Sequence, residues 1–264
     1  MAVAWLILCS VKIITNKGLR RGVLFHYAPF MLHVVFPEIV NEVYSYDRVY
    51  RPKTPDHSIG NFSSIYEELM STKNIEVNPR EFQALPSNII FSEFKREYCN
   101  RQHFDKVRNY IFSKYGIDGS VYEEKYPEVL LVKRSTVNLI DDEEFKKQLN
   151  PHMLANGTMR REIQNIDTVE EMLRQQYGDK FGTVSLESIP HKEQVRYFNS
   201  AKYIICSHGG AVVNSLFCKE GTKIVEVHSL PNNPFKLFDW ISETLDLQHI
   251  KCMNNFDEVC STIR

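Results

Sequence analysis

The second half of the chain alternates short apolar runs with amphipathic stretches, and this alternation restricts the possible folds more than any other feature. Apolar runs of strand length occupy residues 128–133, 183–186, 203–206, 222–227 and 248–251. The stretches between them with helical length and periodicity are residues 168–177, 191–200, 211–217 and 235–244. Strands that are apolar on both faces and alternate with helices form parallel sheets covered on both sides. The sequence therefore predicts an α/β, Rossmann-like lobe over residues 121–264.

The first half, residues 1–120, alternates less regularly. Its apolar runs predict strands at residues 4–14, 23–26 and 87–91. Its periodic stretches predict helices at residues 62–70, 101–115 and 30–44, the last of these interrupted by Pro37. Residues 116–127 contain two glycines and a proline, which is typical of a linker. We therefore expect two lobes that divide near residue 120.

The charge balance excludes one large class of partners. Lysine and arginine number 32 against 33 acidic residues, a net charge of −1, so the chain lacks the basic surface of a dedicated nucleic-acid binder. The apolar run at residues 2–11 is too short to span a bilayer, and we interpret it as a first strand rather than a signal peptide. We therefore expect neither a nucleic-acid partner nor a membrane span, and the oligomeric state stays open.

A turn of small residues follows the apolar run at 203–206. Ser207, His208, Gly209, Gly210 and Ala211 connect this predicted strand to the next helix. The first N–H groups of a helix are unpaired and lie at the positive end of its dipole, so such a turn favours a phosphate. The glycines let a ligand approach the backbone, and His208 adds a donor. The alternative is that His208 only closes a tight turn.

Charged residues follow the neighbouring predicted strands. Glu226 lies near the end of the 222–227 run, where a carboxylate suits ribose hydroxyls, although it could also be a surface strand end. Arg134 follows the 128–133 run, and Arg160 and Arg161 come later. Arginine suits phosphate because its planar fork binds two oxygens at once, but a solvated surface is the more common role of any single arginine.

In five segments, the chain resembles the catalytic domain of family 61 glycosyltransferases. The segments occur in the family's order at residues 130–134, 161–165, 198–201, 207–211 and 221–227. That family includes plant β-1,2-xylosyltransferases and animal O-linked N-acetylglucosaminyltransferases. The chain is short for the family, which indicates a compact microbial or viral member.

The resemblance implies a GT-B-like fold of two Rossmann-like lobes, with the active site in the cleft between them. It also implies a UDP-sugar donor and transfer with inversion. Carried over by position, the donor-binding residues are Arg134, Arg161, Asn165, Ser207, His208, Gly209, Gly210, Ala211, Asn214 and Glu226. The arginines and the His208 turn would face the phosphates, Asn165 would order a helix start, and Glu226 would hold the ribose. The family usually has one glycine between the histidine and the alanine, whereas this chain has two.

The sequence predicts no essential metal and no cofactor. Metal-dependent transferases of the other common fold hold a divalent ion with an Asp-x-Asp pair, and the sequence contains none. The acidic run at residues 141–144 is typical of a helix start instead. Stabilisation of the leaving group then falls to arginines and helix N-termini.

The catalytic base and the sugar contacts are less sharply defined. Inverting transfer needs a carboxylate or imidazole that takes a proton from the acceptor hydroxyl. Pro29 stands where the family often has an acidic residue, so the candidates are His26, His33, Glu38 and Asp56. Asn233, Asp239 and Trp240 follow the 222–227 run and are candidate sugar contacts, because amides bind hydroxyls and rings pack on sugar C–H faces.

These features favour an inverting, metal-independent glycosyltransferase. We expect UDP-xylose, or next UDP-N-acetylglucosamine, as donor and a glycan or glycoprotein hydroxyl as acceptor. The rivals are another nucleotide-using enzyme such as an epimerase, and a catalytically inactive sugar- or nucleotide-binding scaffold protein. The missing Gly-x-Gly-x-x-Gly fingerprint disfavours a dinucleotide enzyme. We expect a cytoplasmic protein, in the host cytoplasm if viral, or a secretory-pathway protein if the chain is part of a longer one.

Overall fold

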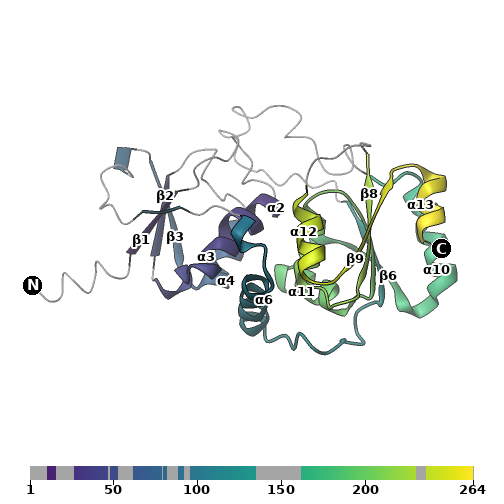
Figure 1. The fold of residues 1–264 in the computed structure, drawn as a ribbon, viewed down its shortest axis with the longest axis horizontal. Helices are drawn as coiled ribbons and strands as arrows, with labels where there is room; N and C mark the ends of the chain where they lie inside the picture. The colour runs from purple at the N-terminus through teal and green to yellow at the C-terminus, as the bar shows by residue number, and fades with distance from the viewer. Residues whose placement is uncertain are drawn as a thin grey trace, which may run out of the picture. The chain divides into compact units, whose positions relative to one another are not determined.

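The chain divides into two compact α/β units (Figure 1). A computed structural model describes residues 11–15, 27–46, 48–52, 62–78, 80–81, 89–91, 96–134, 162–229 and 236–263. The described part of unit 1 ends at Tyr98, and that of unit 2 begins at Cys99. Both units contain a parallel sheet, so the predicted α/β class is confirmed.

Unit 2 is built on a five-stranded sheet in the order β6-β5-β7-β8-β9, with every neighbouring pair parallel. Its strands are β5 (Val129–Lys133), β6 (Phe181–Ser185), β7 (Tyr203–Ser207), β8 (Lys223–His228) and β9 (Gln248–Met253). All five predicted runs are confirmed as strands. The central strands β5, β7 and β8 are almost wholly buried, because helices cover both faces of a parallel sheet.

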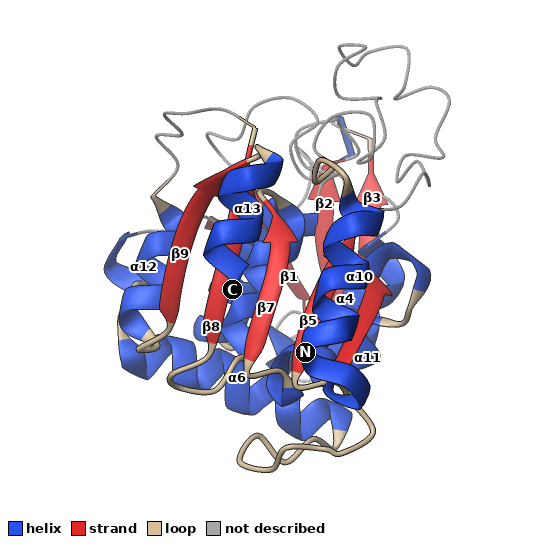
Figure 2. Ribbon diagram, turned by 90° about the vertical axis from the view of Figure 1, so that its right-hand side faces the viewer, coloured by secondary structure: helices blue, strands red, loops and turns tan. Residues whose placement is uncertain are grey.

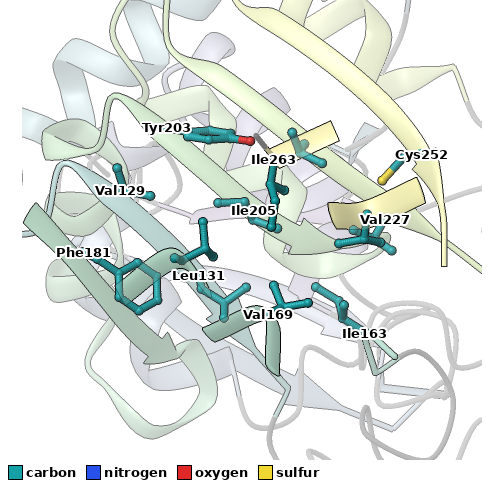
Figure 3. Close-up of a cluster of buried hydrophobic side chains, with 13 residues drawn as sticks. Val129, Leu131, Ile163, Val169, Phe181, Tyr203, Ile205, Val227, Cys252 and Ile263 are labelled. Atoms are coloured by element: carbon teal, nitrogen blue, oxygen red, sulfur yellow. The ribbon is translucent and has the colours of Figure 1, made fainter. Parts of the chain in front are cut away.

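Two helices, α10 (Ile166–Tyr177) and α13 (Phe256–Ile263), cover one face of this sheet (Figures 1 and 2). Their apolar sides meet alternate residues of the strands in one buried cluster (Figure 3). The cluster includes Leu131, Ile205 and Val225 from the sheet, with Val169 from α10 and further residues from α13. The period-2 geometry of a strand then sends the intervening residues, including Cys206 and Glu226, to the opposite face.

The opposite face is covered by α11 (His191–Ser200), α12 (Leu237–Thr244) and the 3-10 helix η8 (Gly210–Phe217). The segment 211–217 was predicted as an ordinary helix. It is instead tightly wound, and it is short and almost entirely buried. Helix α6 (Arg101–Tyr115) packs on η8, where Arg108 Nη2 donates to the carbonyl of Cys218 at 2.8 Å.

The predicted linker at residues 116–127 lies inside unit 2, after α6. Ile117 and Tyr126 are buried. The carbonyl of Val121 accepts hydrogen bonds from Lys219 Nζ at 2.9 Å and from Asn199 Nδ2 at 3.3 Å. These contacts tie the segment to the sheet lobe despite its glycines.

Unit 1 contains a four-stranded parallel sheet in the order β3-β2-β1-β4. Its elements are β1 (Val11–Thr15), α2 (Tyr27–Phe30), the π-helix η2 (Met31–Val35), α3 (Phe36–Val40), η3 (Val43–Ser45), β2 (Arg48–Pro52), α4 (Ser63–Met70), β3 (Lys73–Val77), β4 (Ile89–Phe91) and η5 (Arg96–Tyr98). The sequence did not predict β2 and β3, because each contains charged residues and no continuous apolar run. The predicted strand at 23–26 lies outside the described residues.

Within the predicted helix at 30–44, the helical turns α2, η2 and α3 run continuously to Val40, and the break follows at Glu42, which has φ +58°. Pro37 lies inside this run and has no N–H, so the usual bond back to the residue four positions earlier cannot form there. Just before it, the N–H of Phe36 donates to the carbonyl of Met31, five residues earlier, which makes the π-turn η2. None of the helices in the described part of the chain is long and apolar enough to cross a membrane.

A buried histidine should make the folding of unit 2 pH-dependent. Burial lowers the pKa of His191 from 6.5 to about 3. Below pH 6.5 the unfolded chain therefore binds a proton at His191 that the folded chain does not bind. The contribution of this group to the free energy of unfolding is complete above pH 6.5 and decreases toward pH 3. We expect this group to contribute about 2 kcal/mol to the loss between pH 7.5 and 5.

Urea unfolding of the wild-type protein and the His191→Gln variant at both pH values measures this contribution. The amide is neutral at both, so the variant should lose about 2 kcal/mol less on acidification than the wild type. Equal losses in the two proteins would show that His191 does not carry the effect.

Candidate functional site

The turn between β7 and η8 is shaped by its first glycine. Gly209 has φ +144°, a conformation that L side chains rarely adopt, so glycine is required there. The N–H of His208 donates to the carbonyl of Val227 at 2.8 Å, which extends the pairing of β7 with β8 to the start of the turn. The N–H groups that follow begin η8, where helical N–H groups have no partner inside the helix.

Arg134 holds this turn from the neighbouring strand. It directly follows β5, and its Nε donates to Ser207 Oγ at 3.0 Å while Nη2 donates to the carbonyl of His208 at 2.8 Å. Two of the predicted donor-binding residues, Arg134 and Ser207, thus meet at the C-terminal ends of β5 and β7. The guanidinium adds a permanent positive charge next to the first turn of η8.

Glu226 lies beneath the turn, on the sheet face opposite the α10–α13 cluster. Its side chain is 0 % exposed. Oε1 accepts a hydrogen bond from His208 Nδ1, and Oε2 accepts one from His249 Nε2 at 2.8 Å. His228 Nε2 lies 3.3 Å from Oε2. We call these four residues the Glu226 cluster.

The contacts of the Glu226 cluster keep the carboxylate ionised. Burial alone would raise the pKa of Glu226, but the hydrogen bonds from His208 and His249 and the nearby imidazole of His228 outweigh it and hold the pKa well below its usual range. The cluster is therefore a buried negative charge surrounded by imidazoles.

Ring packing fixes the orientation of His208. Its ring stacks on that of His228, with centroids 4.7 Å apart, and meets the edge of Phe238 at 5.6 Å. The Nδ1 atom faces Glu226, so only Nε2 can face a ligand on the other side of the ring. If His208 binds phosphate as predicted, the contact would be made by Nε2.

Two members of the cluster, His228 and His249, were not identified from the sequence. His228 lies two residues after Glu226 in β8, so the alternation of a strand could have placed it on the same face. His249 is on β9, next to β8, and its position depends on the pairing register, in which it lies opposite Ile224. Its Nδ1 is 3.4 Å from Asp239 Oδ1, which extends the polar network to a predicted sugar contact.

The remaining predicted donor contacts are separate from this network in the described structure. Asn165 directly precedes α10 with φ +52°, and its side chain makes no capping bond, so it does not order the helix start in this way. Asn214 is fully buried and donates to Gln194 Oε1 at 3.3 Å, between η8 and α11. Trp240 is half-buried on α12. Arg161 and Asn233 lie outside the described residues.

Two candidate bases lie in the described part of unit 1. Glu38 is 1 % exposed, and its oxygens accept from Arg51 Nη2 at 2.6 Å and Tyr66 Oη at 2.7 Å. These are the contacts of a structural ion pair between α3, β2 and α4, so the carboxylate is not accessible to an acceptor in this structure. Burial lowers the pKa of His33 to about 4. His26 and Asp56 lie outside the described residues.

Comparison with known proteins places the chain in a family. A family model described as Glycosyltransferase 61 matches residues 16–225, which are 210 of the 264 residues. The matched range includes the β7–η8 turn and Arg134 and ends one residue before Glu226. No curated protein matches the chain.

The buried charge of Glu226 should be important for stability. Glu226→Gln replaces an anion with an amide that can accept from only one of the facing imidazoles through its oxygen, so we expect a loss of about 2–4 kcal/mol in unfolding free energy. Glu220→Gln is the matched control, because the Glu220 side chain is 70 % exposed and should change stability by less than about 0.5 kcal/mol. Denaturant unfolding gives the stability of both variants. If Glu226→Gln were as stable as Glu220→Gln and the wild type, the stabilising role assigned to the Glu226 charge would be contradicted.

Proposed function

Because the chain belongs to the glycosyltransferase 61 family, we propose that it transfers a sugar from a UDP-sugar donor to a hydroxyl of a glycan or glycoprotein. Family membership implies a transferase with a donor and an acceptor substrate. The finer proposal is inversion at the anomeric carbon, in a GT-B-like arrangement of two lobes. UDP-xylose is the first donor to test and UDP-N-acetylglucosamine the second.

The observation that carries the donor assignment is the turn at the C-terminal ends of β5 and β7. Arg134, the glycine at 209 with positive φ, and the start of η8 meet there. Ligands of parallel α/β sheets bind at this edge of the sheet, and phosphates bind at helix N-termini. We propose that the donor diphosphate contacts the N–H groups at the start of η8, Arg134 and Nε2 of His208.

The contacts of Glu226 support a role that differs from the ribose contact implied by the resemblance. Both of its oxygens accept hydrogen bonds from imidazoles, and its side chain has no exposed surface. We propose that Glu226 instead acts through His208, as a positioning residue. The carboxylate fixes the His208 ring so that Nε2, on the side away from Glu226, can donate to the leaving UDP.

Such a site stabilises the leaving group without a metal on the diphosphate. As the bond between the sugar and the phosphate breaks, negative charge grows on the phosphate oxygens, and fixed donors placed there lower the barrier.

Asn233, Asp239 and Trp240 stay proposed sugar contacts. His26, His33 and Asp56 stay proposed bases, and the contacts of Glu38 leave it the weakest of the four. We also propose the cytoplasm as the location.

A panel of UDP-sugars tests the donor assignment. We expect one of them to raise the melting temperature and to release UDP in the presence of the protein. A saturating donor at 100 times its Kd adds about 2.7 kcal/mol to the free energy of unfolding, which is readily seen as a thermal shift. If no UDP-sugar stabilises the protein, the donor assignment fails. Stabilisation without any UDP release would favour the inactive sugar-binding scaffold instead.

Variants at the phosphate site make this test specific. Arg134→Ala and His208→Ala should each weaken UDP binding by at least about tenfold, because each removes a charge-assisted hydrogen bond worth about 1.5–3 kcal/mol. Arg174→Ala is the matched control, since Arg174 is an exposed arginine on α10 that pairs with Glu170. Titration calorimetry with UDP gives the affinities. Unchanged affinity in both site variants would rule out the proposed phosphate site.

A further inference from the structure

The Glu226 cluster gathers three imidazoles around one buried carboxylate. Glu226 and His228 alternate on β8, His208 follows β7, and His249 lies on β9. All four side chains therefore lie on one face of three adjacent strands. The side chains of Glu226, His228 and His249 are at most 8 % exposed, so water is largely excluded from the cluster.

The Nε2 atom of His228 is buried and has no hydrogen-bond partner among the described residues. It lies 3.3 Å from Glu226 Oε2, an oxygen that also accepts from His249 Nε2. Buried polar atoms are nearly always paired, so an orphaned nitrogen directed at an anionic oxygen requires an explanation. A cation held between the two atoms would satisfy both.

The spacing of His228 Nε2 and Glu226 Oε2 fits such a cation. One ligand atom each from His208, Glu226 and His228 lies within 4.8 Å of the other two. Zinc binds histidine nitrogen and carboxylate oxygen at about 2.0–2.2 Å in a tetrahedron, which places ligand atoms about 3.4 Å apart. The separation of 3.3 Å between His228 Nε2 and Glu226 Oε2 agrees with this value.

We propose that His208, Glu226 and His228 bind one divalent transition-metal ion of the Zn²⁺ type. Two imidazoles and one carboxylate suit zinc, whereas Mg²⁺ and Ca²⁺ prefer sets of oxygen ligands. His249 is the positioning residue of the site, because its Nε2–H donates to Oε2, the carboxylate oxygen next to His228, while its other nitrogen faces Asp239. The negative charge of Glu226 offsets part of the charge of the ion.

This ion is distinct from one that would bridge a donor diphosphate. Absence of an Asp-x-Asp pair argues against an ion on the diphosphate, whereas the proposed ion lies beneath the turn, within a nearly buried cluster. His208 would bind it through Nδ1 and keep Nε2 for the other side of the ring. The site stands on its ligand geometry alone and does not rest on glycosyl transfer.

Metal binding to the tag-free full chain tests the proposal directly. The protein is stripped with a chelator, dialysed, and titrated with Zn²⁺ in competition with a chromogenic chelator. We expect one ion per chain, and we expect Co²⁺ in its place to give the intense visible absorption of a tetrahedral site. Neither readout uses a sugar nucleotide, so failure here leaves the UDP-release test unaffected.

Two variants and one control assign the ligands. His228→Gln should weaken Zn²⁺ binding by more than about 100-fold, because loss of a partner outside the ligand set alone costs 10–100-fold. His249→Gln should keep one ion per chain with an affinity about 10–100-fold lower. His103→Gln, at a partly exposed histidine on α6, should bind as the wild type does.

The proposal is overturned if the wild-type protein binds no Zn²⁺ and gives no tetrahedral Co²⁺ spectrum. It is also overturned if His228→Gln binds the ion as tightly as His103→Gln. The Co²⁺ spectrum of the wild-type protein decides the question even if the His228 variant fails to fold.

Discussion

A carboxylate inside a parallel sheet is the constraint on which the candidate site depends. Glu226 has no exposed surface, and an ionised group in such a place is stable only when donors or cations surround it. The surrounding imidazoles come from β8, from β9 and from the start of the turn that follows β7. The register of the sheet, the ring orientation of His208 and the position of the turn are therefore coupled through one buried charge.

The same constraint recurs in unit 1 with a different outcome. Glu38 is equally buried, but its partners are the guanidinium of Arg51 and the hydroxyl of Tyr66. Arg51 Nε also donates to Asn74 Oδ1 at 2.9 Å, so this pair ties two strands to two helices. A guanidinium that stays charged neutralises Glu38, whereas Glu226 is surrounded by imidazoles, whose nitrogens are also ligands for metal ions. This difference is why we assign a functional role to the Glu226 cluster and a structural role to the pair of Glu38 and Arg51.

The fold of unit 2 could be predicted because its strands are continuous apolar runs. The strands β2 and β3 of unit 1 could not, because charged residues such as Arg51 and Glu76 break the apolar pattern, and the partners of Arg51, Glu38 and Asn74, are distant in sequence. The positions of Arg134 and of the turn at Gly209 at one edge of the sheet could be predicted as well, because both directly follow predicted strands. The 3-10 winding of η8 did not, since the pattern shows helical periodicity without distinguishing the two geometries.

The sequence predicts the strands and the turn of the candidate site better than the contacts between its side chains. His208 and Glu226 were recognised as separate ligands of a donor, but their contact depends on the pairing of Cys206 with Glu226 across β7 and β8. His249 joins them only through the register of β9. Register is a tertiary property that a single sequence does not specify, so buried polar networks across strands escape prediction even when each strand is identified.

A crystal structure of the protein with UDP tests the donor site most directly. The proposed site requires the diphosphate oxygens to lie within hydrogen-bonding distance of the N–H groups that follow His208, with Arg134 and His208 Nε2 as further donors. Glu226 should remain in contact with His208 rather than with the ribose. A nucleotide bound away from the C-terminal ends of β5 and β7, or a ribose held directly by Glu226, would contradict this assignment.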